Sequence, residues 1–350
     1  MNNKQKYGQF YTTQYSYILQ NLYVPEEIDY IIEPFCGEGH MLNIIDSENK
    51  HSIEKYDIDP KTEWTCRRDT LKYPPIYKDK FVLTNPPYLA RNKSEDKEIF
   101  DKYDTNDLYK CFLKELLTNQ CIGGILIIPL NFWSSIRASD IELRKNFLEV
   151  YRILYLNIFE EQVFDDTSYT VCSFQFEKRE SSKSTTVFTM IYPSKEQIKL
   201  LFQEENNYTF GGEIYNLPIN NKYSISRLTY KNMKKHNTHI VAKCIDDNEE
   251  NQIGLMMVNE EDIYIDNTPK LSARSYATLI IEPAISMKDQ EKLVDEFNDY
   301  LSRQRKKYHS LFLTNYRESK TIARKRISFD LVYNIVQYIL ETKIQPSLKE

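Results

Sequence analysis

The eight residues from Phe81 to Tyr88, FVLTNPPY, constrain the fold of this chain more than any other stretch. The apolar run that begins at Phe81 is typical of a buried β-strand. Pro86 and Pro87 must end that strand, because neither can donate a backbone hydrogen bond to a neighbouring strand. Open α/β sheets bind their ligands at the carboxyl ends of strands, so we predict a ligand site around Asn85 and Tyr88.

The residue types at this strand end suit one chemical task. Asn85 and Pro86 each precede a proline, which keeps both out of the α region and restricts the directions of their carbonyl groups. The Asn85 side-chain oxygen and the Pro86 carbonyl oxygen can therefore hold the two protons of an exocyclic amino group and direct its lone pair toward an incoming methyl group. Tyr88 adds a flat face for an unstacked base, a contact worth roughly 1–3 kcal/mol. The alternative is a diproline turn that only ends a buried strand.

A second pattern lies upstream, where Tyr30 to Pro34 is predicted as a strand and the glycine loop FCGEG follows it. Glycines let the backbone approach a ligand, and the apolar spacing from His40 to Ile45 predicts a helix whose first N–H groups are free. The loop is not a full dinucleotide fingerprint, because Leu42 stands where the third glycine would fall.

Two aspartates extend this site. Asp57 ends the next predicted strand, Ser52 to Ile58, at about the distance after the glycine loop where an acidic residue receives ribose hydroxyls. The two halves together predict a cofactor that contains adenosine. Asp69 is a candidate acceptor for the adenine amino group, or else a turn residue.

The rest of the first half alternates strands with helical patterns, which predicts parallel βαβ units and an α/β fold. We expect a helix from Leu108 to Leu117 and further strands at 123–129, 151–159 and 169–176, with a loop from Leu89 to Asp104 over the site. The charged, serine-rich stretch from Lys178 to Thr186 is the predicted boundary between a domain of residues 1–180 and one of residues 181–350. An amphipathic stripe from Ile327 to Leu340 predicts a C-terminal helix.

Charge is distributed unevenly along the chain, although the net charge is -5. The segment from Ile214 to Ile245 has six basic and no acidic residues, and tyrosines interleave with them. The segment from Arg303 to Arg326 has nine basic residues against Glu318 alone. Both segments suit a phosphate backbone, with a solvated basic face as the alternative. The candidate DNA-binding residues are Lys222, Arg227, Lys231, Lys234, Lys235, Arg303, Arg305, Lys306, Lys307, Arg324, Lys325 and Arg326.

Composition narrows the class of protein. The six cysteines form no C-x-x-C pair, which favours a reducing compartment and argues against a zinc site. His236 and His239 lack a nearby cysteine or acidic partner, so we expect no metal. No apolar run approaches the roughly 18 residues of a membrane span, and the N-terminus lacks the apolar core of a signal peptide. We therefore expect a cytoplasmic protein.

These motifs, taken in order, resemble the amino methyltransferases that act on adenine N6 in DNA, in the gamma arrangement found in restriction-modification systems. The resemblance covers roughly Lys6 to Phe176 and rests on KYGQFYTT, IIEPFCGEG, YDIDP, RRDTL, NPPY, DLYKCFLKELL, GGILIIPLNFW and the VF before Tyr169. It implies a Rossmann-like mixed sheet with helices on both faces, S-adenosylmethionine as cofactor, and a C-terminal DNA-recognition domain.

Residue by residue, the resemblance implies three groups of contacts. Asn85, Pro86 and Tyr88 would be catalytic, with Tyr88 and Phe164 stacking on the flipped base. The cofactor would contact Phe10, Tyr11, Thr12, Glu33, Phe35, Gly37, Asp57, Asp69 and Asn85. Glu33 departs from the family pattern, which usually has aspartate there, and Asn rather than Ser at position 85 favours adenine N6 over cytosine N4.

The sequence thus predicts a monomer that methylates adenine N6 in duplex DNA and has a separate restriction endonuclease as its possible partner. The alternative is an NPPY methyltransferase of protein glutamine or structured RNA. A DNA-binding subunit that keeps the fold without catalysis is a third possibility.

Overall fold

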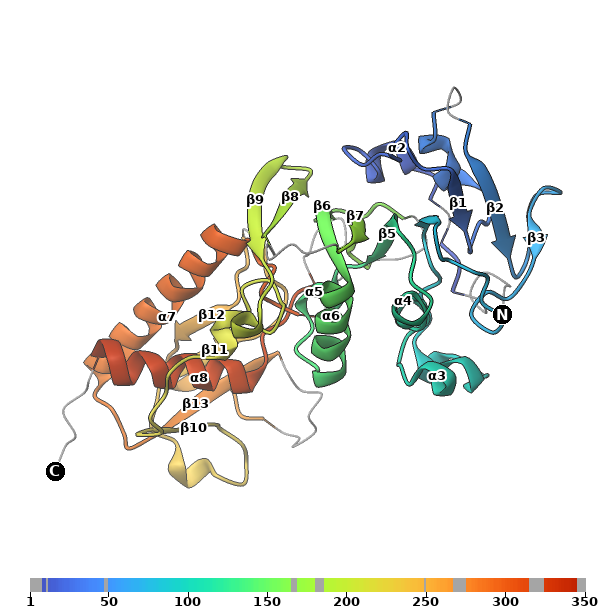
Figure 1. Ribbon diagram of the computed structural model, residues 1–350. Helices are drawn as coiled ribbons and strands as arrows, with labels where there is room; N and C mark the ends of the chain where they lie inside the picture. The colour runs from blue at the N-terminus through green and yellow to red at the C-terminus, as the bar shows by residue number, and fades with distance from the viewer. Residues whose placement is uncertain are drawn as a thin grey trace. The chain divides into compact units, whose positions relative to one another are not determined.

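The computed structural model describes residues 8–10, 12–46, 50–164, 169–179, 186–248, 250–266, 275–314 and 324–344. The chain divides into two compact units, Met1–Glu204 and Glu205–Glu350, both shown in Figure 1. Each unit has its own sheet. They are described in turn.

The first unit contains a nine-stranded mixed sheet with the order β3-β2-β1-β4-β5-β7-β6-β8-β9. The strands β3, β2, β1, β4 and β5 run parallel, whereas β7 is antiparallel to both β5 and β6. Every residue of β4 and β5 is buried, as in parallel strands that are covered on both faces. The bounds are β1 (Tyr30–Glu33), β2 (Ser52–Asp57), β3 (Cys66–Arg67), β4 (Phe81–Thr84), β5 (Gly123–Pro129), β6 (Tyr151–Phe159), β7 (Val171–Lys178), β8 (Thr186–Tyr192) and β9 (Glu196–Leu201).

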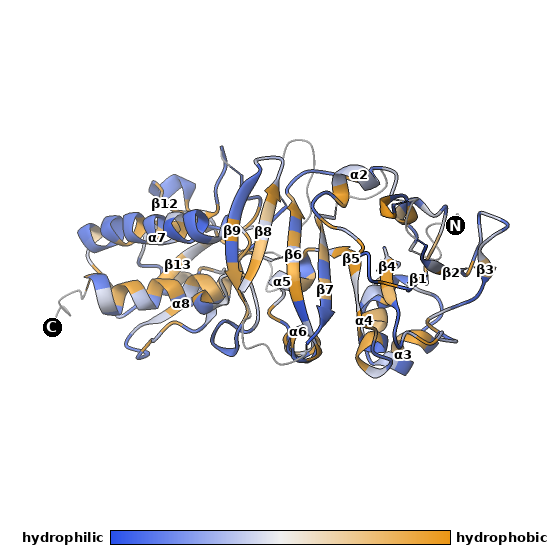
Figure 2. Ribbon diagram, turned by 45° about the horizontal axis from the view of Figure 1, so that its top comes forward, coloured by the Kyte–Doolittle hydropathy of each residue, from blue (hydrophilic) through white to orange (hydrophobic). Residues whose placement is uncertain are grey.

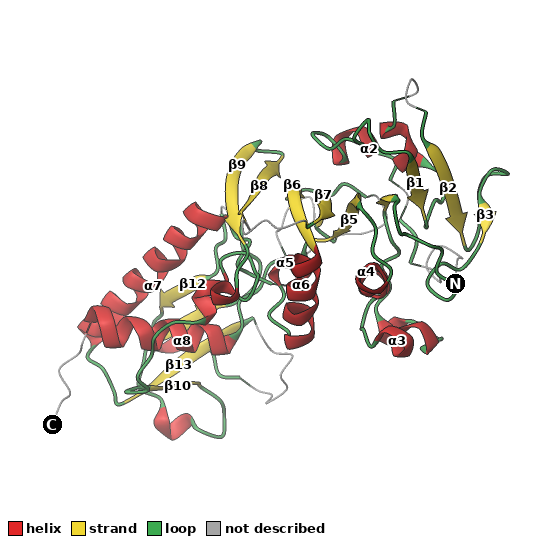
Figure 3. Ribbon diagram, in the orientation of Figure 1, coloured by secondary structure: helices red, strands yellow, loops and turns green. Residues whose placement is uncertain are grey.

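Helices lie on both sides of this sheet, which confirms the α/β class expected from the sequence. The long helices α4 and α6 pack against each other on one side, and the short α2 packs beside η1 on the other (Figures 1 and 3). The bounds are α2 (Tyr15–Ile18), η1 (His40–Ile44), η2 (Arg91–Lys93), α3 (Glu98–Tyr103), α4 (Leu108–Thr118), α5 (Asn131–Ser134) and α6 (Ala138–Val150).

Two local expectations differ from the structure. The helix predicted after the glycine loop is only a 3-10 turn, η1, which ends at an extended Ile45. Part of the segment predicted as a loop between Leu89 and Asp104 forms α3. Phe100 anchors this short helix, because its side chain is only 1% exposed.

The second unit is built on a four-stranded antiparallel sheet with the order β10-β13-β11-β12. The helices α7 and α8 pack against each other, and each begins at a serine, Ser286 and Ser328, whose side chain accepts a backbone N–H of the first turn. The elements are η3 (Glu204–Asn206), η4 (Gly212–Tyr215), β10 (Ser224–Arg227), η5 (Met233–Lys235), β11 (Ile240–Lys243), β12 (Gly254–Met257), η6 (Glu260–Asp262), β13 (Tyr276–Glu282), α7 (Met287–Tyr308), α8 (Phe329–Ile339) and the π-turn η7 (Leu340–Ile344).

The C-terminal helix predicted from its apolar stripe is confirmed as α8. Its apolar face appears in orange along the helix in Figure 2. Leu331, Ile335 and Ile339 are at most 2% exposed and belong to the core of the second unit. That core also takes apolar side chains from β11, β13 and α7. Burial of this stripe holds α8 against its own unit.

The division between the units falls after β8 and β9, not at the stretch from Lys178 to Thr186 that was expected to be a boundary. β8 pairs in parallel with β6, from Tyr155 opposite Phe188 to Phe159 opposite Tyr192. The charged stretch therefore connects two strands of one sheet.

Candidate active site

Three neighbouring strands place the polar residues that the sequence singled out. Glu33 ends β1, Asp57 ends β2, and Asn85 follows the last residue of β4. Because β2, β1 and β4 are adjacent and parallel, their carboxyl ends meet at one edge of the sheet. All three side chains line one cleft that opens to solvent, with about 560 Å³ of empty space when the solvent at its mouth is included.

The N-terminal arm, Gly8 to Thr12, holds the amide of Asn85. The Asn85 Nδ2 donates to the carbonyl oxygen of Phe10 at 2.8 Å and to the Thr12 hydroxyl at 3.1 Å. The arm is itself fixed, since the Tyr88 backbone N–H donates to the Gly8 carbonyl at 2.9 Å. Gly8 has φ +65°, and a Cβ at this position would lie 2.7 Å from the Tyr88 carbonyl oxygen. The nitrogen side of the amide is thereby occupied, and its oxygen faces Tyr88.

Tyr88 has one hydroxyl proton for two acceptors. Its hydroxyl lies 2.8 Å from the Ile127 carbonyl oxygen and 2.5 Å from Asn85 Oδ1. Burial raises the pKa of Tyr88 well above its ordinary value, so the hydroxyl stays protonated at neutral pH. When the Tyr88 hydroxyl donates to the Ile127 carbonyl, the Asn85 oxygen is left to accept from a substrate.

The aromatic rings expected to hold a base lie around Phe10. The Phe10 ring stacks on Tyr88 with centroids 5.4 Å apart, and its centroid lies 6.4 Å from that of Phe164. Tyr88 and Phe164 are both buried, and Tyr109 packs edge-on against Tyr88. Phe10 was expected to contact only the cofactor. The structure places it in the aromatic cluster as well as in the lining of the cleft.

The glycine loop closes on Asp57. The Gly37 backbone N–H donates to Asp57 Oδ2 at 2.8 Å, and Oδ1 accepts from the Asp59 N–H and from Gln9 Nε2. Gly37 and Gly39 both have positive φ, and a Cβ on Gly39 would lie 2.6 Å from the Trp64 ring. The loop therefore needs glycine at these positions to reach the carboxylate.

Glu33, like Gln9, lines the cleft and has a buried side-chain oxygen without a hydrogen-bond partner among the described residues. Its side chain is 1% exposed, and its Oε2 has no hydrogen-bond partner in the part of the chain that the structure describes. Burial raises the pKa of Glu33 well above its ordinary value, and the nearby Asp57 carboxylate raises it further. A buried acceptor of this kind suits a cationic ligand.

Asp69 does not line the cleft with the other predicted residues. It lies in an adjoining hollow that shares Phe35, Ile58 and Pro87 with the cleft. Its Oδ1 accepts the backbone N–H groups of Leu71 and Lys72 at 3.1 and 3.0 Å, as a turn aspartate does. Tyr11, which was also expected to contact the cofactor, lies outside the described residues.

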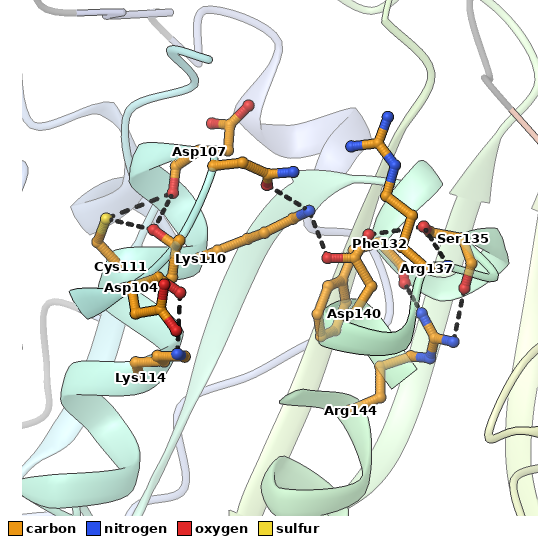
Figure 4. A network of polar contacts seen from close by, with 12 residues as sticks. Asp104, Asp107, Lys110, Cys111, Lys114, Phe132, Ser135, Arg137, Asp140 and Arg144 are labelled. Carbon is orange, nitrogen blue, oxygen red and sulfur yellow. Dashed lines mark hydrogen bonds and ion pairs between the residues drawn. The ribbon is translucent and has the colours of Figure 1, made fainter. Parts of the chain in front are cut away.

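A buried polar network supports the loop after β5, and no sequence pattern pointed to it (Figure 4). Lys110 on α4 donates to Asp140 on α6 at 2.6 Å, and both side chains are at most 7% exposed. Ser135 donates to the same carboxylate at 2.6 Å, and Arg144 donates to the backbone oxygens of Phe132 and Ser135. Losing one partner of such a pair typically costs about 3–5 kcal/mol, so the network fixes the segment that follows Pro129.

Sequence reasoning also missed Gln9 and Met41 in the cleft lining. Gln9 is adjacent to the predicted Phe10, so its place in the same motif was the available signal. Met41 carries no chemical signal of its own, because an apolar residue after a glycine loop is equally typical of a core.

The structure divides the twelve basic residues predicted to bind DNA. Arg227 pairs with Asp266 at 2.8 Å and Arg305 with Asp247 at 2.7 Å, and both aspartates are 2% exposed. Lys235, Lys307 and Arg324 form exposed ion pairs with Glu282, Glu213 and Asp246. Lys325 is 5% exposed. Six exposed basic residues form no ion pair within the described part of the chain: Lys222, Lys231, Lys234, Arg303, Lys306 and Arg326.

Two general features complete the description. Among the described residues, no group of three or more His, Cys, Asp or Glu side chains is arranged to hold a metal ion. In the same part of the chain, no helix has both the length and the apolar character needed to cross a membrane.

Comparisons with known proteins gave matches to solved structures alone. No protein-family model matches the chain, and no curated protein matches it. A modification subunit of a putative type I restriction enzyme from Vibrio vulnificus aligns at 14% identity and a TM-score of 0.42, over 54% of this chain and 49% of that one.

Two further structures give similar values. A type I restriction-modification methyltransferase subunit from Streptococcus thermophilus aligns at 15% identity and a TM-score of 0.41, over 55% of this chain and 50% of that one. A putative class I S-adenosylmethionine-dependent methyltransferase from Listeria monocytogenes aligns at 13% identity and 0.38, over 50% and 61%. The chain is thus similar to about half the length of each of the two modification subunits.

Proposed function

We propose that this protein transfers a methyl group from S-adenosylmethionine to the N6 amino group of an adenine flipped out of duplex DNA. The observation that carries the proposal is the position of Asn85. It lies at a strand end, its amide nitrogen is held by the arm, and its side chain lines the cleft that Glu33 and Asp57 also line.

The residues of the cleft fit the proposed cofactor. S-adenosylmethionine supplies an electrophilic methyl group on a sulfonium cation and also carries a cationic amino group. The unpartnered Oε2 of Glu33 offers a buried acceptor for a cation, the positive-φ glycines let the backbone approach closely, and Asp57 would receive ribose hydroxyls. Phe35 lines both the cleft and the adjoining hollow that contains Asp69.

The protein's own residues would act chiefly by positioning. Asn85 Oδ1 and the Pro86 carbonyl would accept the two protons of the adenine amino group, which turns the nitrogen lone pair toward the methyl group. The new nitrogen–carbon bond forms as the carbon–sulfur bond breaks, and the amino group then releases one proton to solvent. Tyr88 keeps its own proton because burial raises its pKa, so it serves as a stacking surface and not as a base.

Flipping the base out of the duplex costs a few kcal/mol, which stacking and hydrogen bonds in the pocket offset. Tyr88 and Phe164 would provide the two faces of that pocket. Phe10 contacts both rings in the structure, so we infer that its side chain turns away when the base enters.

A tritium-transfer assay tests the proposal. The protein and labelled S-adenosylmethionine are incubated separately with duplex DNA, structured RNA and a release-factor protein that presents a glutamine. We expect label in the DNA alone, as N6-methyladenine after digestion. Label in protein or RNA alone would support the alternative NPPY activity and overturn the DNA assignment.

We further propose that the protein is the modification partner of a separate restriction endonuclease and acts as a monomer. Sequencing the DNA of cells that express it should show N6-methyladenine within one short recognition sequence. Methylation without sequence preference would contradict a role in restriction-modification, because the modifying enzyme must recognise the same sequence as its endonuclease.

A further inference from the structure

We propose that the loop from Thr229 to His236, here called the basic loop, is the surface by which the second unit contacts duplex DNA. The inference rests on the proposed function and narrows the predicted DNA-binding residues to one place. The loop follows β10, the edge strand of the four-stranded sheet (Figure 1), and leads to β11.

The basic loop is braced by its own hydrogen bonds. Asn232 Oδ1 accepts from the backbone N–H of Thr229 at 2.7 Å and from its hydroxyl at 2.9 Å, and Asn232 Nδ2 donates to the Arg227 carbonyl at 3.1 Å. The short turn η5 lies within the loop. A braced loop loses little conformational entropy on binding, so its contacts contribute more fully to affinity.

Both ends of the basic loop are anchored to β13 and its surroundings. After the loop, Asn237 exchanges two hydrogen bonds with the backbone of Ile281, at 2.7 and 3.1 Å. Before it, Arg227 pairs with the buried Asp266 at 2.8 Å and lies over the Phe329 ring. Arg227 thus has a structural role at the base of the loop and is not available to phosphate.

The outer part of the basic loop combines free cations with exposed apolar groups. Tyr230 is 57% exposed and Met233 is 47% exposed. Lys231 and Lys234 are also exposed, and within the described residues neither forms an ion pair. The sequence from Leu228 to Ile240 contains no acidic residue. The loop therefore offers two cations without an ion-pair partner for phosphate contact, with exposed apolar side chains next to them in the sequence.

The chemistry of this surface fits a nucleic-acid duplex better than an apolar partner. Lysines position a protein by contacting phosphates, and the sequence is read by side chains that reach base edges or sugars in a groove. Tyr230 directly precedes Lys231, and Met233 directly precedes Lys234. Phosphate contact by the two lysines would therefore bring the Tyr230 and Met233 side chains to a groove.

The second basic segment offers a contrast. Arg305 donates twice to the buried Asp247, at 2.7 and 3.2 Å, and once to the Ile253 carbonyl, so it holds α7 to its unit. Lys307 and Arg324 are exposed but paired with Glu213 and Asp246. Removing these two cations changes the net charge by the same amount as removing Lys231 and Lys234. They therefore provide a matched control.

The experiment compares two double variants of the full chain, Lys231→Ala with Lys234→Ala and Lys307→Ala with Arg324→Ala. Binding to duplex DNA is measured by fluorescence anisotropy over a range of salt concentrations. Removing the two loop lysines should weaken binding by on the order of tenfold and flatten the log–log salt plot by about 0.9 for each lost phosphate contact, whereas the control pair should match the wild type. Equal loss in both pairs, or no loss in the loop pair, would overturn the inference.

A third variant tests the apolar part of the loop. Tyr230→Ala should leave the salt dependence of DNA affinity unchanged. It should reduce the preference for duplexes that contain the recognition sequence over duplexes that lack it. Unchanged preference would remove Tyr230 from the proposed surface. Methyl transfer by the wild-type protein is measured alongside. If the wild type methylates DNA and the loop variants bind normally, only the loop assignment fails; if the wild type does not act on DNA, the proposed function fails first.

Discussion

At the scale of single residues, the Asn85 side chain has a fixed orientation, and its amide oxygen can still accept a hydrogen bond from a substrate. Both contacts of its Nδ2 are to the arm, and its oxygen lies within hydrogen-bond distance of the Tyr88 hydroxyl, which can donate to Ile127 instead. Asn85→Ala should therefore abolish the two-acceptor grip, lowering kcat by about 10²–10³ or more, as for loss of one positioned transition-state partner. Binding of S-adenosylmethionine, measured by calorimetry, should stay within a few-fold of wild type. Unchanged methylation by this variant would favour a non-enzymatic role.

Glu33 gives the second residue-scale prediction. Because burial raises its folded-state pKa, the stability that Glu33 contributes is present below its unfolded pKa and is lost as pH rises through the folded value. Glu33→Gln cannot ionise, so the stability of this variant relative to the wild type should rise between acidic and neutral pH. Chemical denaturation of the two proteins at acidic and at neutral pH measures the difference.

The same substitution should act in the opposite direction on the cofactor. A cation in the cleft favours the ionised form of Glu33, so the wild type should bind S-adenosylmethionine more tightly as pH rises. The glutamine variant should bind more weakly and lose this pH dependence. A variant that is both more stable and equally tight would show that Glu33 does not face the cofactor.

At the scale of elements, the start of α4 is tied to the segment that follows the NPPY corner. Asp107 Oδ1 accepts the Leu89 N–H at 3.1 Å, and Ala90 and Asp107 form an isolated β-bridge. Burial raises the pKa of Asp107 to about 6, despite the opposing effect of Lys110 and of backbone N–H groups. A free aspartate titrates at about 3.9. The stabilising contribution of Asp107 is therefore full below about pH 4 and is lost as pH rises through about 6.

Asp107→Asn tests this assignment, since asparagine keeps an oxygen for the Leu89 N–H but cannot ionise. The difference in unfolding free energy between the variant and the wild type should shift in favour of the variant between pH 4 and pH 7. Denaturant midpoints at four pH values measure it. A constant difference over that range would mean that Asp107 is not the titrating group.

Element by element, the sequence predicted what depends on local pattern. The strands that became β1, β2, β4, β5, β6 and β7, and the helices α4 and α8, have the apolar periodicity of their class. Parallel strands have their carboxyl ends at one edge of a sheet. The sequence could therefore predict that Glu33, Asp57 and Asn85 lie close together. Ion pairs between residues far apart in the chain could not be predicted from the sequence. The partners of Arg227 and Arg305 are Asp266 and Asp247, far away in the sequence, so a basic segment looked free where much of it is neutralised.

At the scale of the whole molecule, the extent of the first unit leads to a prediction about fragments. β8 and β9 extend the sheet beyond β6, and the compact unit ends at Glu204. A fragment of residues 1–204 should unfold cooperatively and bind S-adenosylmethionine. A fragment of residues 1–180 lacks both strands and exposes the edge of β6, which should make it aggregate. Size-exclusion chromatography and thermal unfolding compare the two. A monomeric, cooperative 1–180 fragment would restore the boundary expected from the sequence.

Phe10 makes two separate contacts in the site, one through its backbone and one through its ring, and this bears on how a base could enter. Its backbone carbonyl holds the Asn85 amide, while its ring contacts Tyr88 and Phe164. Rotation about χ1 moves the ring and leaves the carbonyl in place, so the pocket could open without releasing the amide. If the proposed function is right, the Phe10 ring now lies where the base would stack, and it keeps water out of that position. Base entry would then replace the Phe10 ring with the adenine ring. The free energy needed to remove water from the pocket would already have been spent when the protein folded.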